Sequence, residues 1–289
     1  MKVGNLDLVR LHNLQLVGKK ISDMLQLGMH PSIRAGMGTE FEQYRHYQAG
    51  DDPRRIDWKR LARTGKYMVQ ESAIESHQHF RFMLDLSGSM NYEEGGFTRL
   101  DYAKILIASL ANMAYRQGDE LSLFGLKNGK IEVLTEPGKQ AFRMALYQLE
   151  KAEAGGKWIA PEEGYFSLIN KQKEILVLVS DLLQVNEEWL QTIKSLISPR
   201  REIIIVQLLG EQELDFSIQG FYRFQDLESG KHVELNAGSV RADYLKAMRA
   251  YLDMLDDKLR FPNLTYLRIS LQTPIAEAVR DCVLKHQQS

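Results

Sequence analysis

The stretch His79-Phe80-Arg81-Phe82-Met83-Leu84-Asp85-Leu86-Ser87-Gly88-Ser89-Met90 decides the fold of this chain. The part up to Asp85 is a short run rich in apolar and aromatic residues, which predicts a buried β-strand. The part after Asp85 is made mostly of small and hydroxyl-bearing residues, which are typical of a tight turn whose side chains hydrogen-bond to the backbone. Residues 79–90 therefore predict a buried strand that ends in a polar loop.

Outward from this strand, short β-rich runs alternate with helical patterns along the rest of the chain. The other predicted strands are 120–126, 130–134, 174–180, 202–209 and 265–269. The predicted helices are 99–116, 139–151, 187–197, 240–258 and 274–286. Runs 221–224 and 232–235 predict a hairpin, because Glu228-Ser229-Gly230 lies between them. The alternation predicts an α/β fold with a doubly wound, mainly parallel sheet over residues 79–289.

Residues 1–78 are predicted to form an N-terminal extension of this domain. Apolar residues recur at three- and four-residue steps from Leu6 to Leu27, which predicts an amphipathic helix that Pro31 ends. Glycine and proline punctuate the stretch from Gly36 to Gly65, so we expect irregular structure with short elements there. Because the extension has few apolar clusters of its own, we expect it to pack on the main domain.

The composition excludes several classes of protein. The chain has 37 basic and 38 acidic side chains, and a net charge of −1 creates no overall field that would attract nucleic acid or anionic lipid. Cys282 is the only cysteine, which excludes an intramolecular disulfide and a cysteine-based zinc site. No signal peptide is recognisable, and no apolar run approaches the ~18 residues needed to span a bilayer. We therefore expect a cytoplasmic protein.

One local cluster of basic and aromatic residues could contact nucleic acid. It consists of Arg54, Arg55, Lys59, Arg60, Arg63 and Lys66, with Trp58 and Tyr67 between them. Acidic residues at 51, 52 and 57 favour ion pairs within the chain instead, so we expect no nucleic-acid partner. We expect Asp57, Trp58 and Arg63 to fasten the extension, and Trp58→Ala to cost about 3–5 kcal/mol if Trp58 is buried.

Two polar loops are expected at one edge of the sheet. One follows the strand that ends at Asp85, and the other is Ser180-Asp181 after the strand 174–180. Loops at the carboxyl ends of neighbouring parallel strands converge, and Mg²⁺ prefers oxygen ligands. Asp85, Ser87, Ser89 and Asp181 are therefore predicted to form a site for Mg²⁺ or Mn²⁺. The alternative is that Asp85 and Ser87 only cap backbone amides of the turn.

The pattern Asp85-x-Ser87-x-Ser89 with a distant Asp181 resembles the metal-ion-dependent adhesion site of von Willebrand factor A domains. In that family the site holds a cation, and an acidic side chain of a partner protein completes the coordination. The resemblance implies the same role for these four residues. A third loop, expected near 155–160, should supply a Thr, but no Thr or Ser lies between Lys151 and Tyr165. We therefore expect a degenerate site with weak metal binding.

A narrower resemblance covers nearly the whole chain. It rests on Gly38-Thr39-Glu40-Phe41, Tyr44-Arg45-x-Tyr47, Gly50-Asp51-Asp52, Arg55-Ile56-Asp57-Trp58, Ala62-Arg63 and Phe224-x-Asp226-Leu227-Glu228-x-Gly230. Together with the loop after Asp85, these motifs resemble domain-of-unknown-function family 58. Members of that family are bacterial, von Willebrand factor A-like and often encoded beside MoxR-type AAA+ ATPases. The resemblance implies an adaptor or a partner that presents substrates.

Two functions remain open at this point. The first is a non-catalytic protein-binding adaptor that partners a MoxR-type AAA+ ATPase or its client. The second is a metal-dependent phosphohydrolase that uses Asp85 and Asp181. An Asp-x-Asp pattern would favour the second, but residue 87 is Ser. The sequence also has no phosphate-binding glycine loop and no Gly-x-Ser-x-Gly nucleophile turn, so we expect no enzyme activity.

Overall fold

The computed structural model describes residues 13–28, 43–48, 51–71, 78–161 and 173–286, and all structural statements below refer to these. The chain divides into two compact units. The main unit contains residues 1–27 and 78–289, and the second unit contains residues 28–77. Each unit is described by itself.

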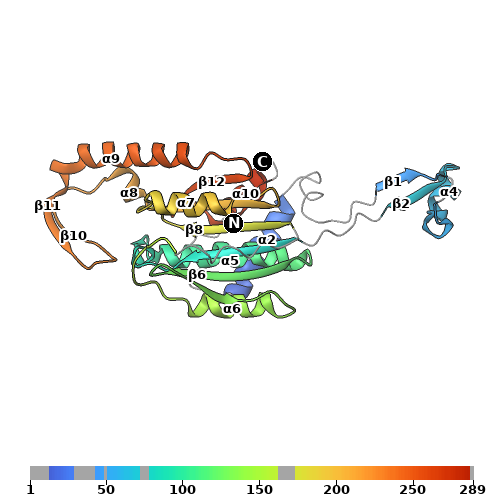
Figure 1. The fold of residues 1–289 in the computed structure, drawn as a ribbon, viewed down its shortest axis with the longest axis horizontal. Coiled ribbons are helices and arrows are strands. Elements are labelled where there is room, and N and C mark those ends of the chain that lie inside the picture. Colours follow the sequence, from blue (N-terminus) through green and yellow to red (C-terminus); the bar gives the residue numbers. More distant parts are fainter. Residues whose placement is uncertain (1–12, 29–42, 49–50, 72–77, 162–172, 287–289) are drawn as a thin grey trace. The chain divides into compact units, whose positions relative to one another are not determined.

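The main unit is built on a six-stranded sheet with the strand order β12-β9-β8-β3-β6-β7 (Figure 1). Its strands are β3 (His79–Asp85), β6 (Glu120–Lys127), β7 (Lys130–Thr135), β8 (Glu174–Ser180), β9 (Arg201–Leu209) and β12 (Leu264–Ser270). All neighbours are parallel except β7, which pairs antiparallel with β6 at one edge. Because β3 lies between β6 and β8, the winding direction reverses at β3. This confirms the predicted doubly wound, mainly parallel sheet.

Helices cover both faces of this sheet. The helices are α5 (Arg99–Arg116), α6 (Ala141–Lys151), α7 (Glu187–Leu196), α9 (Ala237–Lys258) and α10 (Ile275–His286). Helices α5, α6 and α10 pack on one face, where α5 contacts β3, β6 and β9. Helices α7 and α9 pack on the other face, and together with the sheet they enclose a core around the stacked rings of Trp158 and Trp189. Cys282 of α10 is fully buried, as a small core residue.

The N-terminal helix α2 (Leu14–Gly28) belongs to the main unit. The Ser22 hydroxyl donates to the backbone oxygen of Ser109 in α5, and a Cβ on Gly18 would lie 2.8 Å from the backbone oxygen of Ala108. Helix α2, the first part of the predicted extension, thus lies within the main unit. The reason is that the apolar side of α2, which includes Ile21, is buried within the main unit. Residues 6–12 of the predicted helix, and Pro31, lie outside the described residues.

The second unit contains β1 (Gln43–His46), the 3-10 helix η1 (Pro53–Arg55), α4 (Trp58–Thr64) and β2 (Met68–Glu71). Strands β1 and β2 pair antiparallel. The Asp52 carboxylate accepts from the amide of Arg54, and the Asp57 carboxylate accepts from the amide of Arg60, so both acids cap short helices. Within this unit Trp58 is 58% exposed, and its expected role in fastening the extension stays a prediction. Packing of this unit on the main unit stays a prediction.

Short elements surround the carboxyl ends of the strands. They are η2 (Gly88–Asn91), β4 (Glu93–Glu94), β5 (Phe97–Thr98), α8 (Glu211–Asp215), β10 (Phe221–Gln225) and β11 (His232–Asn236). Strands β10 and β11 form the predicted hairpin, which Figure 1 shows beyond the end of the sheet near α8. Within the described part of the chain, no helix has the length and apolar character to cross a membrane.

Candidate functional site

Asp85 joins the two loops that the sequence places at the edge of the sheet. It is the last residue of β3, and it lies beside Ser180, the last residue of the neighbouring strand β8. Its Oδ2 accepts a hydrogen bond of 2.7 Å from the Ser180 hydroxyl, and its Oδ1 accepts one of 2.8 Å from the amide of Ser87. Asp85 therefore caps the turn, as one of the two sequence interpretations expects.

The two serines of the motif lie on the turn that follows Asp85. The Ser87 and Ser89 hydroxyls are 2.9 Å apart and hydrogen-bonded to each other. Ser87 is fully buried, whereas Ser89 is partly exposed. Ser87 is the N-cap residue of η2, but its side chain makes no capping bond there. One hydrogen bond thus links the two hydroxyls inside the loop.

Asp181 follows β8 directly, and an arginine side chain connects its carboxylate to the first loop. The Arg99 Nη1 atom lies 2.6 Å from Oδ2 of Asp181 and donates to the backbone oxygen of Ser89 at 2.9 Å. The other carboxylate oxygen, Oδ1, accepts from the amide of Leu183. The four predicted site residues therefore converge, and Arg99 connects the two loops.

Arg99 is the first residue of α5, a position at which the helix dipole disfavours a positive charge. The preceding residue, Thr98, forms a capping box with Asp101, so the helix start is fixed in place. The second guanidinium nitrogen, Nη2, lies 2.5 Å from Oε2 of Glu213 in α8. The cation is thus held between two carboxylates from different parts of the chain.

Because the charged side chains of this cluster are buried, each one affects the pKa of its neighbours. Arg99 is 1% exposed and Asp181 is 2% exposed. Burial alone would lower the pKa of the Arg99 guanidinium, but Asp181 and Glu213 outweigh burial and raise it. Burial, together with the charge of Asp181, raises the pKa of Asp85 to about 7 despite the hydrogen bonds to this carboxylate. The guanidinium also lies over the ring of Tyr92, 4.8 Å from its centroid.

Helix α8 is held in place by Glu94. The Glu94 carboxylate accepts from the amides of Glu211 and Gln212 and from the Tyr92 hydroxyl. A Cβ on Gly210 would lie 2.3 Å from Oε2 of Glu94, so a larger residue at the start of α8 would make this carboxylate shift. Glu94 thereby positions the helix that carries the second carboxylate on Arg99.

The third loop lies against the first, where the sequence predicts it. The backbone oxygen of Gly156 accepts from the amide of Gly88, and the backbone oxygen of Leu86 accepts from the amide of Gly155. The contact is made by the backbones of the two loops. The third loop, which in the adhesion-site pattern supplies a Thr, here supports the first loop through these two hydrogen bonds.

The turn of the β10–β11 hairpin packs against the first loop. A Cβ on Gly88 would lie 2.4 Å from the backbone oxygen of Leu227, so only glycine leaves room for the turn. Oε2 of Glu228 accepts from the amide of Trp158 at 3.1 Å. Burial, with the nearby charge of Asp181 as a smaller cause, raises the pKa of Glu228. The Leu227-Glu228 turn therefore covers part of the site.

The hydrogen bonds within the site concern the same oxygens that the sequence predicts as ligands of Mg²⁺ or Mn²⁺, and binding of either ion stays a prediction. All four carboxylate oxygens of Asp85 and Asp181 accept hydrogen bonds from within the chain, and the two serine hydroxyls bond to each other. A divalent ion at Oδ2 of Asp181 would compete with the guanidinium of Arg99. In the described part of the chain, no group of three or more His, Cys, Asp or Glu side chains is arranged to hold a metal ion.

Three site residues were missed from the sequence: Arg99, Glu213 and Glu228. The available signal for Arg99 was a basic residue in the first turn of a predicted helix, where the dipole favours acidic residues. Glu228 lies within a run that the family resemblance singles out, without a role assigned to it. Glu213 has no comparable signal, because its contact with Arg99 joins residues far apart in the sequence.

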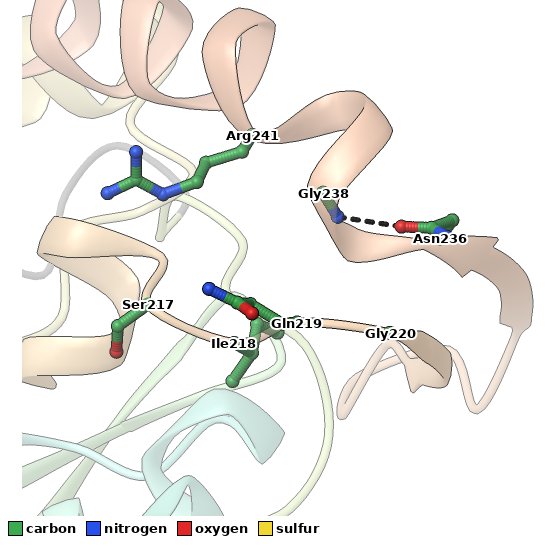
Figure 2. A pocket seen from close by; sticks show the side chains of 7 residues that line it. All are labelled: Ser217, Ile218, Gln219, Gly220, Asn236, Gly238 and Arg241. Atoms are coloured by element: carbon green, nitrogen blue, oxygen red, sulfur yellow. Dashed lines mark hydrogen bonds between the residues drawn. The ribbon is translucent and has the colours of Figure 1, made fainter.

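A separate open pocket lies between the segment after α8 and the start of α9 (Figure 2). Its volume is about 510 Å³, and it is lined by Ser217, Ile218, Gln219, Gly220, Asn236, Gly238 and Arg241. The Arg241 guanidinium donates to the backbone oxygens of Asp215 and Phe216. This cation is therefore engaged in holding the chain, and none of the converging site residues lines the pocket.

A family model described as protein of unknown function DUF58 matches residues 43–252. The chain belongs to the DUF58 family. The DUF58 chain is 25% identical over 249 residues to the uncharacterized protein Rv1480 of Mycobacterium tuberculosis. This alignment covers 83% of the DUF58 chain and 77% of the relative. The uncharacterized protein Mb1516 of Mycobacterium bovis matches with the same figures.

Solved structures of low sequence identity are also similar to this DUF58 chain. The conserved hypothetical protein BatB from Bacteroides thetaiotaomicron has 12% identity and a TM-score of 0.46, covering 73% of this chain and 99% of BatB. The SpRpn10 VWA domain has 10% identity and a TM-score of 0.40, covering 71% and 94%. A von Willebrand factor type A protein from Catenulispora acidiphila has 14% identity and a TM-score of 0.42, covering 76% and 43%. The sheet of the DUF58 chain itself is the doubly wound, mainly parallel sheet that the sequence predicts.

Proposed function

We propose that this DUF58 protein is a non-catalytic protein-binding adaptor, whose binding surface is the β10–β11 hairpin together with the loops at the carboxyl ends of the strands. The observation that carries the proposal is the exposed apolar surface of the hairpin. Tyr222 and Val233 are 46% and 53% exposed on one face of the hairpin, and Phe221 is 84% exposed on the other face. Contiguous exposed apolar surface is typical of a site that a protein partner covers.

The pairing of the hairpin gathers apolar side chains on one face. Tyr222 is opposite Leu235 and Phe224 is opposite Val233, so these four side chains share a face of the two-stranded sheet. Phe224 is partly covered by Phe216, whose ring centroid lies 5.9 Å away. Tyr222 and Val233 stay 46% and 53% exposed. A two-stranded sheet with an uncovered apolar face is suited to packing against another protein.

Exposed apolar side chains continue from the hairpin strands to the loops of the site. Leu227 is 46% exposed on the turn that packs against Gly88, and Ile159 is 47% exposed on the third loop. Trp158, next to Ile159, donates its backbone amide to Glu228 of the hairpin turn, so the two segments are neighbours. The polar cluster beneath them fixes the loops, and the exposed side chains supply the contact surface.

The geometry does not favour the alternative, a phosphohydrolase using Asp85 and Asp181. Asp85 is fully buried and accepts two hydrogen bonds, so a phosphate group has no direct approach to it. The Asp181 carboxylate is engaged in an ion pair with Arg99. A nucleophile must lie within reach of the substrate atom that it attacks, and neither carboxylate meets this condition.

The partner class follows from the family resemblance. Members of family 58 are often encoded beside MoxR-type AAA+ ATPases, so the proposed partner is such an ATPase or its client. Adaptors of this kind require a surface that recognises a second protein, and they require no turnover of their own. The hairpin and the adjoining loops meet the first requirement.

The test uses two matched double variants of the full chain. Tyr222→Ser with Val233→Thr alters the hairpin face, and Tyr147→Ser with Val133→Thr alters equally exposed residues on α6 and β7. Affinity for the purified MoxR-type ATPase of the same genome is measured by biolayer interferometry. We expect the hairpin variant to lose at least about tenfold in affinity, which corresponds to about 1.4 kcal/mol.

The control variant should bind like the wild type, and both proteins should keep the wild-type melting temperature. Equal affinity of the hairpin variant and the wild type contradicts the proposed surface. No binding of the wild type contradicts the proposed partner. Hydrolysis of a phosphate monoester by the wild type with Mg²⁺, lost in Asp85→Asn, contradicts the assignment as a non-catalytic protein.

A further inference from the structure

We propose that the Arg99 guanidinium takes the place of the divalent cation in this degenerate adhesion site, so that the edge of the sheet is held together without a metal ion. The inference concerns the site itself and does not depend on the proposed partner. It predicts that the protein has no need of Mg²⁺ or Mn²⁺ at Asp85, Ser87, Ser89 and Asp181.

The first step of the argument is that Arg99 makes the connections that a bound cation would make between the loops. Its Nη1 contacts Asp181 of the loop after β8 and the backbone oxygen of Ser89 in the loop after β3. Its Nη2 adds Glu213 of α8. Three separate segments are thus drawn together by one positive charge from α5.

The second step concerns charge balance in a buried place. Asp181 is 2% exposed and forms the ion pair with Arg99. A second aspartate, Asp85, is fully buried, and the charge of Asp181 acts on it. A buried carboxylate requires a compensating cation, because transfer of an unpaired charge from water is very unfavourable. Arg99 is the cation in direct contact with Asp181, and its side chain is 1% exposed.

The third step concerns the choice of residue at position 99. A cation at the first position of a helix is disfavoured by the helix dipole, so local helix stability does not account for Arg99. Guanidinium is always charged, is more weakly hydrated than ammonium and presents several donors in a fixed plane. These properties suit a buried group that must bridge Asp181, Glu213 and a backbone oxygen at once.

The experiment begins with the wild-type full chain, prepared in chelator and then freed of it. Mg²⁺ and Mn²⁺ are titrated into the protein by calorimetry, and the melting temperature is measured with chelator and with each ion at millimolar concentration. We expect no saturable heat and a melting temperature unchanged by either ion. Saturable Mn²⁺ binding by the wild type that is lost in Asp181→Asn overturns the proposal.

The second part removes the guanidinium. Arg99→Ala leaves the carboxylates of Asp181 and Glu213 without their cation, and we expect the melting temperature to fall by about 10 °C. Mn²⁺ should restore at least half of this loss, because the emptied position presents two carboxylates and the Ser89 backbone oxygen to a hard cation. Adding Asp181→Asn to Arg99→Ala should abolish the rescue.

Two controls distinguish a local replacement from a general effect of the ion. Arg268→Ala breaks an ion pair with Asp256 on the surface, and Mn²⁺ should not change the melting temperature of this variant. Arg99→Lys keeps a positive charge, and it should be more stable than Arg99→Ala and unaffected by Mn²⁺. If Arg99→Ala yields no folded protein, the wild-type titration and Arg99→Lys still decide. A folded Arg99→Ala protein without Mn²⁺ rescue, or Arg99→Lys that gains Mn²⁺ binding, overturns the proposal.

Discussion

The Arg99 Nη1 atom lies 2.6 Å from Oδ2 of Asp181, between side chains that are 1% and 2% exposed. This ion pair joins the start of α5 to the loop after β8 across the carboxyl edge of the sheet. Removing one member of a buried pair is costly, because the other member keeps its charge in a place that water does not reach. The same pair thus fixes the geometry of the candidate site and contributes to the stability of the whole domain.

Replacing Asp181 by Asn should destabilise the protein much more than the same change at the surface. We expect Asp181→Asn to cost about 3–5 kcal/mol, because the buried guanidinium loses its closest carboxylate. The matched change is Asp256→Asn, whose partner Arg268 is 30% exposed. For that exposed pair we expect a cost below about 1 kcal/mol.

Urea unfolding followed by circular dichroism measures both free energies of unfolding. Equal costs of the two substitutions would show that the Arg99–Asp181 pair contributes no more than a surface ion pair. A change in the slope of the unfolding transition would indicate an altered unfolded state, and that variant would be compared at a single urea concentration.

Gly88→Ala should release the hairpin turn from the first loop. The new Cβ would lie 2.4 Å from the backbone oxygen of Leu227, so one of the two segments must move. We expect a cost of about 1–3 kcal/mol and faster amide hydrogen exchange in residues 221–236. The control is Gly155→Ala on the neighbouring loop, where the nearest heavy atom to the new Cβ, Lys127 Nζ, is 3.8 Å away.

Hydrogen exchange with mass spectrometry compares the two glycine variants with the wild type. Protection of the hairpin should fall in Gly88→Ala and stay unchanged in Gly155→Ala. Unchanged protection in both variants would mean that the hairpin turn is held by contacts other than its packing on Gly88.

The fold could be predicted from the sequence because buried strands and helices have recognisable local patterns of apolar residues. Strand β3 is predicted with its observed bounds, His79–Asp85, since a run of apolar residues covered on both faces is recognisable without knowing its neighbours. Helix α5 is likewise predicted with its observed bounds, Arg99–Arg116. The alternation of such elements limits the topologies to a doubly wound sheet.

The site could be predicted only in part. Asp85, Ser87 and Ser89 are close in sequence, and Asp181 follows a strand that the winding rule places beside β3, so their convergence was predictable. The contact between Arg99 and Asp181 joins residues 82 positions apart, and no local pattern shows which carboxylate a helical arginine meets. The missing Thr near residues 155–160 predicts a degenerate site, but it gives no indication that Arg99 contacts Asp181.

Helix α2 and Trp58 show the same limit of local sequence patterns, which do not identify distant partners. The apolar stripe of α2 predicts a helix that must pack on something, but the stripe does not say on what. The contact of Gly18 with the backbone of Ala108 in α5 assigns the helix to the main unit. Trp58 was expected to help fasten the extension by aromatic packing, and no local pattern in the sequence indicates its 58% exposure within the second unit.

The two tryptophans of the α7 face and Trp58 should differ sharply in their effect on stability. The rings of Trp158 and Trp189 are stacked 3.9 Å apart at 5°, and Trp189 is 2% exposed. We expect Trp189→Ala to cost about 3–5 kcal/mol, because it opens a large cavity in the core. The exposed Trp58, changed in the same way, should cost less than about 0.5 kcal/mol.

Thermal and urea unfolding compare the two substitutions, and near-ultraviolet circular dichroism follows the stacked pair. The strong near-ultraviolet signal should be lost in Trp189→Ala and kept in Trp58→Ala. A large destabilisation by Trp58→Ala would mean that its side chain is covered in the folded protein, as the sequence alone predicts.

His79 should make the stability of the domain depend on pH below neutrality. The ring is 2% exposed in the sheet and hydrogen-bonds to the Ser122 hydroxyl at 2.9 Å. Burial, and then the charge of Arg81, lowers the pKa of His79 from its ordinary value of 6.5, against smaller effects of Glu174 and Glu120. The folded protein therefore prefers the neutral ring.

Because the pKa of His79 is lower in the folded state, the unfolded chain binds more protons between the two pKa values. The stability that the neutral ring contributes is complete above about pH 6.5 and is lost progressively as the pH falls below that value. His79→Gln removes this proton uptake. The difference in unfolding free energy between wild type and His79→Gln should thus be greatest above pH 7 and should shrink toward pH 5. Urea titrations at half-unit pH steps measure this difference, and a constant difference over the whole range would show that the protonation of His79 is not linked to folding.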